Sequence, residues 1–299
     1  MALNLIDIHI HGQGGLDVMS QDPRDILKLS SRLREQGVAG FLPTIISSPK
    51  KDILRTLENI KSVHGQEKGA KILGVHLEGP FLHPQRKGTH NLKYIRPMNL
   101  KEVKEWVAVG EGLVKLVTLA PELPGAEPVI RYLVKKGVRV SMGHSTAKWS
   151  EARLGKAFGA KSVTHLFNAM EPFHHREPGL VGFALYDRDL FTEVIADGVH
   201  LSDETLRFIL KTRPLDKIIL ITDGFYLTKL KNHGVFNFGG LKVKVFPDGS
   251  LRKLDGTLSG SNTTLSEIVN RVLKLKVLPR QKVLAMASAN PLKLLGMSL

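Results

Sequence analysis

The chain has 299 residues, of which 42% are hydrophobic, so it can build a large buried core in one or two domains. It contains no cysteine, which excludes disulfides, thiolate metal ligands and cysteine nucleophiles. The formal net charge is +15, but the basic residues are spread along the chain and only 6% of residues are aromatic. We therefore expect that most basic side chains lie on solvated helix faces, where they also attract an anionic small substrate. We expect no nucleic-acid partner.

The first predicted strand, Leu5–His11, carries two histidines one residue apart among apolar neighbours, as in a strand buried on both sides. Side chains two apart in a strand point to the same face, so His9 and His11 can aim two imidazoles at one metal ion. Local hydrogen bonds would satisfy the same two side chains equally well. The spacing alone leaves both interpretations open.

Apolar β-type runs then alternate with amphipathic stretches, which is typical of parallel strands joined by crossover helices. Eight strands are predicted, at 5–11, 38–46, 71–77, 114–120, 138–144, 162–167, 192–197 and 217–222. Helices are predicted at 23–36, 51–63, 100–109, 128–136, 148–158 and 202–211. This α/β pattern predicts a (β/α)₈ TIM-like barrel. A doubly wound sheet is the alternative, but Gly12-Gln13-Gly14-Gly15 does not match its phosphate-binding fingerprint.

The pattern changes after the eighth strand. Residues 235–254 alternate as in a β-hairpin, with Pro247–Ser250 as the turn, and helices follow at 265–275 and 280–295. No linker rich in proline, glycine or serine divides the chain, so we expect a single catalytic barrel domain over residues 1–299 with a hairpin insertion. We see no signal peptide and no apolar run of membrane-spanning length, and we therefore expect a cytoplasmic protein without membrane contacts.

Polar residues gather where six of the predicted strands end. The carboxyl ends of barrel strands meet at one face, and catalytic side chains come from several of them. A single histidine at a strand end is more often a packing residue, but six strands that end this way indicate a shared site. These residues are His9 and His11, His76 and Glu78, His144, Thr164 and His165, Asp197 and His200, and Thr222 and Asp223.

In this order, the motifs closely resemble those of the N-acetylglucosamine-6-phosphate deacetylases of the amidohydrolase superfamily. The matching segments are 7–12, 74–80, 87–91, 143–145, 164–170, 176–179, 195–200, 221–223 and 256–261. The resemblance covers nearly the whole chain. It implies metal-dependent hydrolysis of the acetamide of N-acetylglucosamine 6-phosphate, which yields glucosamine 6-phosphate and acetate.

The resemblance also implies the metal ligands. Glu78, His144 and His165 resemble the ligands of the principal catalytic metal, and His9 and His11 resemble those of a second metal that Glu78 bridges. Oxygen and nitrogen donors suit zinc, iron, cobalt or manganese, so we expect a divalent ion of this group, with one or two per subunit.

The same resemblance implies a role for Asp223 as the catalytic acid and base, although its position after a strand would also suit a helix N-cap. His90 resembles a histidine that polarises the acetyl carbonyl or binds a sugar hydroxyl. Asn168, the Ala169 backbone and His200 resemble groups that hold the sugar and its phosphate. His174 and His175 do not fit the ligand pattern, and we expect them in a polar loop.

Arg176 resembles an arginine that reaches across a two-fold interface to the phosphate in the neighbouring subunit. The resemblance therefore implies a homodimer whose sites are completed in trans. A surface ion pair with Glu177 or with another surface carboxylate is the simpler alternative.

Two other functions remain open at this stage. The chain could hydrolyse a different amide or a cyclic imide with the same chemistry. It could also be a metal-binding barrel with little activity, because related proteins carry flanking strands that form an accessory β-sandwich, and we expect none of those strands in this sequence.

Overall fold

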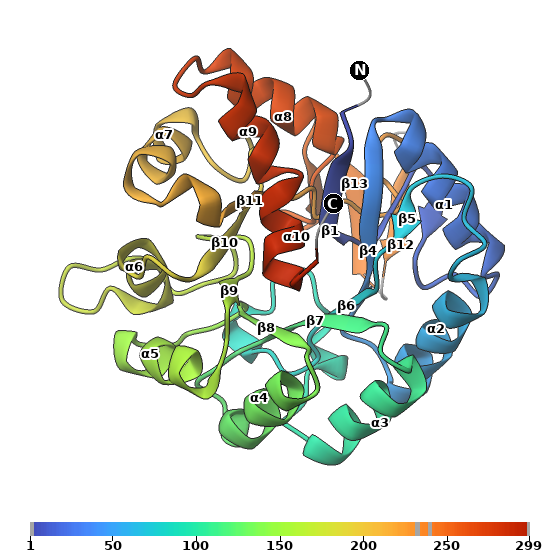
Figure 1. The fold of residues 1–299 in the computed structure, drawn as a ribbon, viewed down its shortest axis with the longest axis horizontal. Helices are drawn as coiled ribbons and strands as arrows, with labels where there is room; N and C mark the ends of the chain where they lie inside the picture. The colour runs from blue at the N-terminus through green and yellow to red at the C-terminus, as the bar shows by residue number, and fades with distance from the viewer. Residues whose placement is uncertain (1–2, 231–233, 239–240, 298–299) are drawn as a thin grey trace.

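The computed structural model describes residues 3–230, 234–238 and 241–297. Eight parallel strands form a nearly closed barrel with helices around it (Figure 1), which confirms the predicted (β/α)₈ fold. In their order around the barrel, the strands are β1 (Leu5–Ile10), β4 (Val38–Ile46), β6 (Val75–Glu78), β7 (Val114–Leu119), β8 (Arg139–Met142), β9 (Ser162–Val163), β10 (Phe191–Val194) and β11 (Ile218–Leu220). The short β5 (Lys71–Ile72) also pairs with β4, and β2 (Gly12–Gln13) pairs with β3 (Leu16–Asp17).

Most of the helices lie outside the strands and bury one apolar face, as crossover helices of a barrel do. They are α1 (Arg24–Glu35), α2 (Lys50–Val63), α3 (Leu100–Gly110), α4 (Ala126–Lys135), α5 (Trp149–Phe158), α6 (Gly179–Tyr186), α7 (Asp203–Thr212), α8 (Leu265–Lys274), α9 (Arg280–Met286) and α10 (Ala289–Leu295). Short 3₁₀ turns lie at Pro84–Arg86, Leu92–Tyr94 and Leu215–Lys217. Among the described residues, no helix is both long enough and apolar enough to span a bilayer.

Side-chain and backbone bonds between the last barrel strand and the first close the barrel. The Asp223 N–H donates to the His9 carbonyl at 2.9 Å, and the His11 N–H donates to the Gly224 carbonyl at 2.6 Å. The Thr222 hydroxyl donates to Asp7 at 2.6 Å. Burial raises the pKa of Asp7 to about 6, although the Thr222 hydrogen bond opposes this shift. These bonds form a seam between residues 7–11 and 222–224, and this seam places His9, His11 and Asp223 side by side.

Helix α6 was not predicted, because it lacks an amphipathic pattern. Nearly all of its residues are apolar or glycine, and six of the eight are buried. A helix that is buried all round has no polar face for a periodicity search to detect.

The predicted helix 280–295 is instead two helices, α9 and α10, divided at Ala287 and Ser288. Pro291 lies four residues after Ala287, and a proline cannot donate to that carbonyl and clashes with it in a continuous helix. The Ala287 carbonyl instead accepts the N–H of Ile6 in β1 at 2.7 Å. After the break, α10 crosses one end of the barrel (Figure 1), where Leu292 and Leu295 join a buried cluster with residues of β1, β4, β7 and β11.

The region predicted as a hairpin forms three antiparallel strands, β12 (Val235–Phe238), β13 (Leu241–Val245) and β14 (Leu251–Lys253). The expected turn, Pro247–Ser250, joins β13 to β14. Residues 239–240 of the predicted hairpin lie outside the described residues.

Trp106 on α3 allows a test of the core. Its side chain is fully buried and stacks on Phe81, with ring centroids 5.1 Å apart. We expect Trp106→Ala to lower the free energy of unfolding by about 3–5 kcal/mol, the usual cost of removing a buried aromatic side chain. Urea unfolding followed by circular dichroism measures this. Leu154→Ala is the control, because Leu154 is 48% exposed. An equal loss in both variants would contradict the core packing described here.

Candidate metal centre and active site

His9 in β1 and His11, which directly follows this strand, both turn their Nε2 atoms toward two carboxylates. His9 Nε2 lies 3.3 Å from Glu78 Oε1 and 3.4 Å from Asp223 Oδ1. His11 Nε2 lies 3.2 Å from Glu78 Oε2 and 3.4 Å from Asp223 Oδ1. Four candidate metal ligands from three strand ends, His9, His11, Glu78 and Asp223, therefore face one point.

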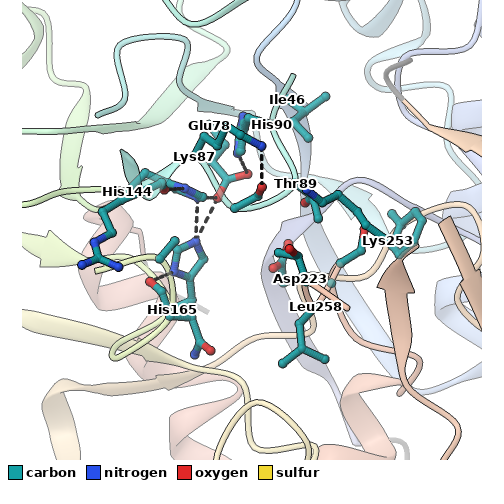
Figure 2. A pocket seen from close by; sticks show the side chains of 18 of the residues that line it. Ile46, Glu78, Lys87, Thr89, His90, His144, His165, Asp223, Lys253 and Leu258 are labelled. Atoms are coloured by element: carbon teal, nitrogen blue, oxygen red, sulfur yellow. Dashed lines mark hydrogen bonds and ion pairs between the residues drawn. The ribbon is translucent and has the colours of Figure 1, made fainter. Parts of the chain in front are cut away.

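Glu78 at the end of β6 also meets two histidines from the opposite side of the barrel. Its Oε1 lies 3.0 Å from His144 Nε2 and 3.1 Å from His165 Nε2. The two Nε2 atoms are themselves 3.0 Å apart. Figure 2 shows both imidazoles pointing to the Glu78 carboxylate. The structure thus brings together the three residues expected to hold the principal metal.

The second ring nitrogen of each of these histidines bonds to a backbone carbonyl. His144 Nδ1 donates to the Arg86 carbonyl at 2.8 Å, and His165 Nδ1 donates to the Asn168 carbonyl at 3.1 Å. His11 Nδ1 donates to the Thr44 carbonyl at 3.0 Å. Because the proton of a neutral imidazole is then on Nδ1, the Nε2 atoms carry lone pairs, which is the tautomer that binds metals.

These lone pairs need a cation. His144 Nε2 and His165 Nε2 face each other at 3.0 Å, so two neutral imidazoles with their protons on Nδ1 would bring two lone pairs together, and these repel each other. Among the described residues, the buried His9 Nε2 has no hydrogen-bond partner, although the Glu78 and Asp223 carboxylates lie 3.3 and 3.4 Å from it. Three donors about 3 Å apart can all lie at the usual bond length of about 2.0–2.2 Å from one ion. The residues present therefore fit a divalent metal ion with nitrogen and oxygen ligands.

Charge around Glu78 supports the same conclusion. Burial would raise the pKa of Glu78, but His9, His90 and His144 outweigh it and hold that pKa well below its usual range. Burial would likewise lower the pKa of His11, but Asp223 and Glu78 raise it to about 9. The buried carboxylates thus attract positive charge, which protons on the histidines or a metal ion can supply.

His90 is arranged differently from the other histidines. Its Nδ1 accepts from the Ser47 hydroxyl at 2.7 Å, so its proton is on Nε2, which lies 3.1 Å from Glu78 Oε2. Burial lowers the pKa of His90 to about 4, although the Glu78 charge opposes this shift. His90 is therefore a neutral hydrogen-bond donor, which suits a group that contacts substrate better than a metal ligand.

A cavity of about 490 Å³ opens over this centre. Figure 2 shows Asp223 lining it together with Glu78, His90, His144 and His165. Asn168, Ala169 and His200, which were expected to hold substrate, also line it. Lys87 and Lys253 add two ammonium groups, and Lys253 comes from β14 of the small antiparallel sheet.

Arg176 is the one expected site residue that the described structure places neither in the cavity lining nor in the buried ligand cluster. It is exposed, and its guanidinium contacts His175 at 3.1 Å. Glu177 Oε1 accepts the N–H groups of Trp149 and Gly179, at 2.9 and 3.2 Å, and Arg176 forms no ion pair with a carboxylate of the described residues. His174 and His175 lie exposed in the same loop.

Glu193 was missed, and the roles of Asp197 and His76 were not predicted, because only contacts in three dimensions reveal them. Asp197 holds His200 Nδ1 at 2.8 Å, so the other nitrogen of His200 is directed to the cavity. Glu193 on β10 contacts His9 Nδ1 at 3.1 Å. His76 lies deeper in the barrel, bonded to Thr118 at 2.8 Å, and burial lowers its pKa well below the usual histidine range.

A parallel barrel with histidines and carboxylates gathered at its strand ends defines the class of metal-dependent hydrolases. The chain belongs to the amidohydrolase family, whose model matches residues 4–299.

Individual relatives have more specific names than the family. The chain is 40% identical to an N-acetylglucosamine-6-phosphate deacetylase of Bacillus subtilis over 88% of this chain and 67% of that protein. It is 34% identical to an N-acetylgalactosamine-6-phosphate deacetylase of Escherichia coli O157:H7, over 97% of this chain and 77% of that protein.

Solved structures agree with the sequence comparisons. An N-acetylglucosamine-6-phosphate deacetylase of Thermotoga maritima superimposes with a TM-score of 0.90 at 36% identity, and covers 98% of this chain and 78% of that chain. The Mycobacterium smegmatis enzyme in complex with N-acetyl-D-glucosamine 6-phosphate gives a TM-score of 0.91 at 31% identity, over 98% of this chain and 77% of that chain.

The metal ligands can be tested one at a time. We expect His144→Ala or His165→Ala to remove the principal metal and nearly all turnover, because each supplies an unprotonated Nε2 to the Glu78 side of the cluster. His9→Ala and His11→Ala should lower only a second equivalent of metal. Elemental analysis of the purified variants measures both effects. Full metal content in His144→Ala and His165→Ala would refute this assignment.

Proposed function

We propose that this chain hydrolyses the acetamide of N-acetylglucosamine 6-phosphate to glucosamine 6-phosphate and acetate. The observation that carries this proposal is the convergence of Glu78, His144 and His165 on one point beside Asp223 and His90. The identity to named deacetylases favours this substrate class over other amides or a cyclic imide. It also favours an active enzyme over a barrel that only binds metal.

We propose two metal positions. Glu78, His144 and His165 would hold the principal ion, and His9, His11, Glu78 and Asp223 would hold a second one. Zinc, iron, cobalt and manganese all suit these donors. A divalent cation bound there lowers the pKa of water enough to supply hydroxide near neutral pH and polarises the amide carbonyl.

The protein residues move the protons. Asp223 accepts a proton from the attacking water as the oxygen adds to the acetamide carbon. His90 donates its Nε2–H toward the carbonyl oxygen, where negative charge develops. Asp223 then returns the proton to the nitrogen as the C–N bond breaks, because a free amide anion is a poor leaving group. The products are acetate and the free amine of the sugar.

Charge in the cavity supports a phosphorylated substrate. Lys253 is bound by Asp255 at 2.7 Å. Lys87 has no carboxylate partner among the described residues; burial and the neighbouring Lys253 lower its pKa. Two ammonium groups in one cavity repel each other until an anion lies between or beside them. His200 and the Asn168–Ala169 backbone offer further contacts for the sugar and phosphate.

The galactosamine epimer is a second candidate substrate, because one relative bears that name. Acetate release from both 6-phosphates, with the unphosphorylated sugars as controls, distinguishes them. The proposal predicts that N-acetylglucosamine 6-phosphate is preferred. Acetate release from neither 6-phosphate by the metal-loaded chain would refute the proposed function.

Asp223→Asn tests the proton transfer. The amide keeps the size of the side chain but cannot accept a proton, so we expect turnover to fall by about 10²–10⁴-fold. The principal metal and substrate should still bind. Steady-state kinetics with elemental analysis measures this, and Asp216→Asn is the control, because Asp216 is an exposed carboxylate that pairs with Lys293 outside the cavity. Near-normal turnover in Asp223→Asn would mean that another group transfers the proton.

We further propose a homodimer in which Arg176 of each subunit contacts the substrate phosphate bound by the other. This arginine lies outside the cavity of its own subunit, and Phe173 and Tyr186 near it are 54% and 72% exposed. Exposed aromatic side chains beside an arginine are typical of an interface.

Arg176→Ala should weaken binding of the phosphorylated substrate by about 2–4 kcal/mol, the usual cost of losing a buried charged contact. It should barely change binding of the unphosphorylated sugar. The decisive measurement mixes Arg176→Ala subunits with Asp223→Asn subunits. In a mixed dimer, the site with intact Asp223 receives intact Arg176 from its partner, so activity should reappear. No recovery despite proven subunit exchange would exclude the trans arrangement.

A further inference from the structure

Glu193 is a buried carboxylate that no step above uses. It lies on β10, and both Glu193 and His9 are fully buried. Its Oε2 lies 3.1 Å from His9 Nδ1. His11, His144 and His165 each bond through Nδ1 to a backbone carbonyl. Among the histidines that face the cluster through Nε2, His9 is thus the one in the described structure whose partner is a carboxylate.

A carboxylate partner differs from a carbonyl in its charge. Both acceptors keep the proton on Nδ1, but a carboxylate also makes the imidazole more basic and a stronger metal ligand. Glu193 forms no ion pair with a lysine or arginine in the described part of the chain, and its Oε1 has no hydrogen-bond partner. A buried negative charge with so little compensation is costly unless a cation lies nearby.

The alternative proton position is unfavourable. If the proton of neutral His9 moved to Nε2, it would point to Glu78 Oε1 at 3.3 Å, and the cluster would need no metal there. The lone pair of Nδ1 would then face the Glu193 carboxylate at 3.1 Å, and the two would repel each other. Glu193 therefore works against the arrangement in which His9 is only a hydrogen-bond donor.

We propose that Glu193 is a positioning residue that commits this chain to a second metal ion. It fixes the proton of the neutral His9 imidazole on Nδ1 and so directs the Nε2 lone pair to the cluster, where a cation held by His9, His11 and Asp223 would compensate the buried charge of Glu193 through the imidazole. The inference deepens the proposed function, on whose two-metal arrangement it rests. It assigns the choice between one and two metals to a side chain that contacts neither the substrate nor the metal.

Glu193→Gln is the direct test, because the glutamine oxygen still accepts from His9 Nδ1 while the charge is lost. Metal-depleted full-length protein is titrated with Co²⁺, and binding is followed by visible absorbance and elemental analysis. We expect the wild type to bind two equivalents. The variant should keep the first equivalent and bind the second about 10–100-fold more weakly, the usual effect of losing such a partner.

Glu67→Gln is the matched control. Glu67 is also a buried carboxylate, at 5% exposure, with one oxygen on the Ile72 N–H at 3.2 Å and the other without a partner. The Glu67→Gln variant should bind both equivalents of Co²⁺ as the wild type does. Glu193→Asp keeps the charge but shortens the side chain, and we expect an intermediate affinity. This variant also carries the test if Glu193→Gln does not fold by circular dichroism.

Three results would overturn the inference: an undiminished second equivalent in Glu193→Gln, equal weakening of both equivalents, or a wild type that binds only one. The proposed function is tested separately by acetate release. A wild type that releases acetate with one equivalent would refute the role of Glu193 and leave the deacetylase proposal intact. A wild type that binds two equivalents of Co²⁺ but releases no acetate would refute the deacetylase proposal and leave the role of Glu193 intact.

Discussion

The Glu78 carboxylate is the point on which the rest of the site depends. Its two oxygens lie 3.0–3.3 Å from the Nε2 atoms of five histidines that come from four other parts of the chain. The barrel allows this because its strands end at one face and the seam between β11 and β1 joins the two ends of the sheet. In their neutral forms with the proton on Nδ1, four of the five imidazoles present a lone pair at Nε2, so the assembled cluster is complementary to a cation.

The backbone at the strand ends is what turns these side chains inward. His144, His165 and Asp223 all have positive backbone φ angles, at 49°, 30° and 49°. Residues other than glycine rarely adopt this backbone conformation. Each such residue costs of order 1–3 kcal/mol, which the surrounding ladder of hydrogen bonds must offset. The conformation ends the strand and redirects the chain at the position of the functional side chain. Backbone strain of this kind is common at active sites, where it positions functional side chains at a cost in stability.

Sequence patterns were sufficient for the alternation of strands and helices and for most of the residues gathered at the barrel mouth. The predicted strand at 162–167 ends too late, because the observed strand β9 covers only Ser162–Val163. His165, Phe167 and Ala169 adopt positive φ angles that usually indicate a glycine, and none of the three is a glycine. Sequence patterns missed α6 because it has no polar face, and they joined α9 to α10 because the break at Ala287 depends on a contact with β1. Glu193, Ser47 and Asp197 act through other side chains, and nothing in their local sequence reveals those contacts.

The central claim is that the unprotonated Nε2 atoms around Glu78 exist to hold a metal ion. The most direct measurement is anomalous X-ray scattering from crystals of this chain, recorded on both sides of the metal absorption edge. The account predicts a strong peak within about 2.0–2.2 Å of Glu78 Oε1, His144 Nε2 and His165 Nε2. Density without anomalous signal there, with water molecules bonded to those three atoms in metal-supplemented crystals, would contradict it.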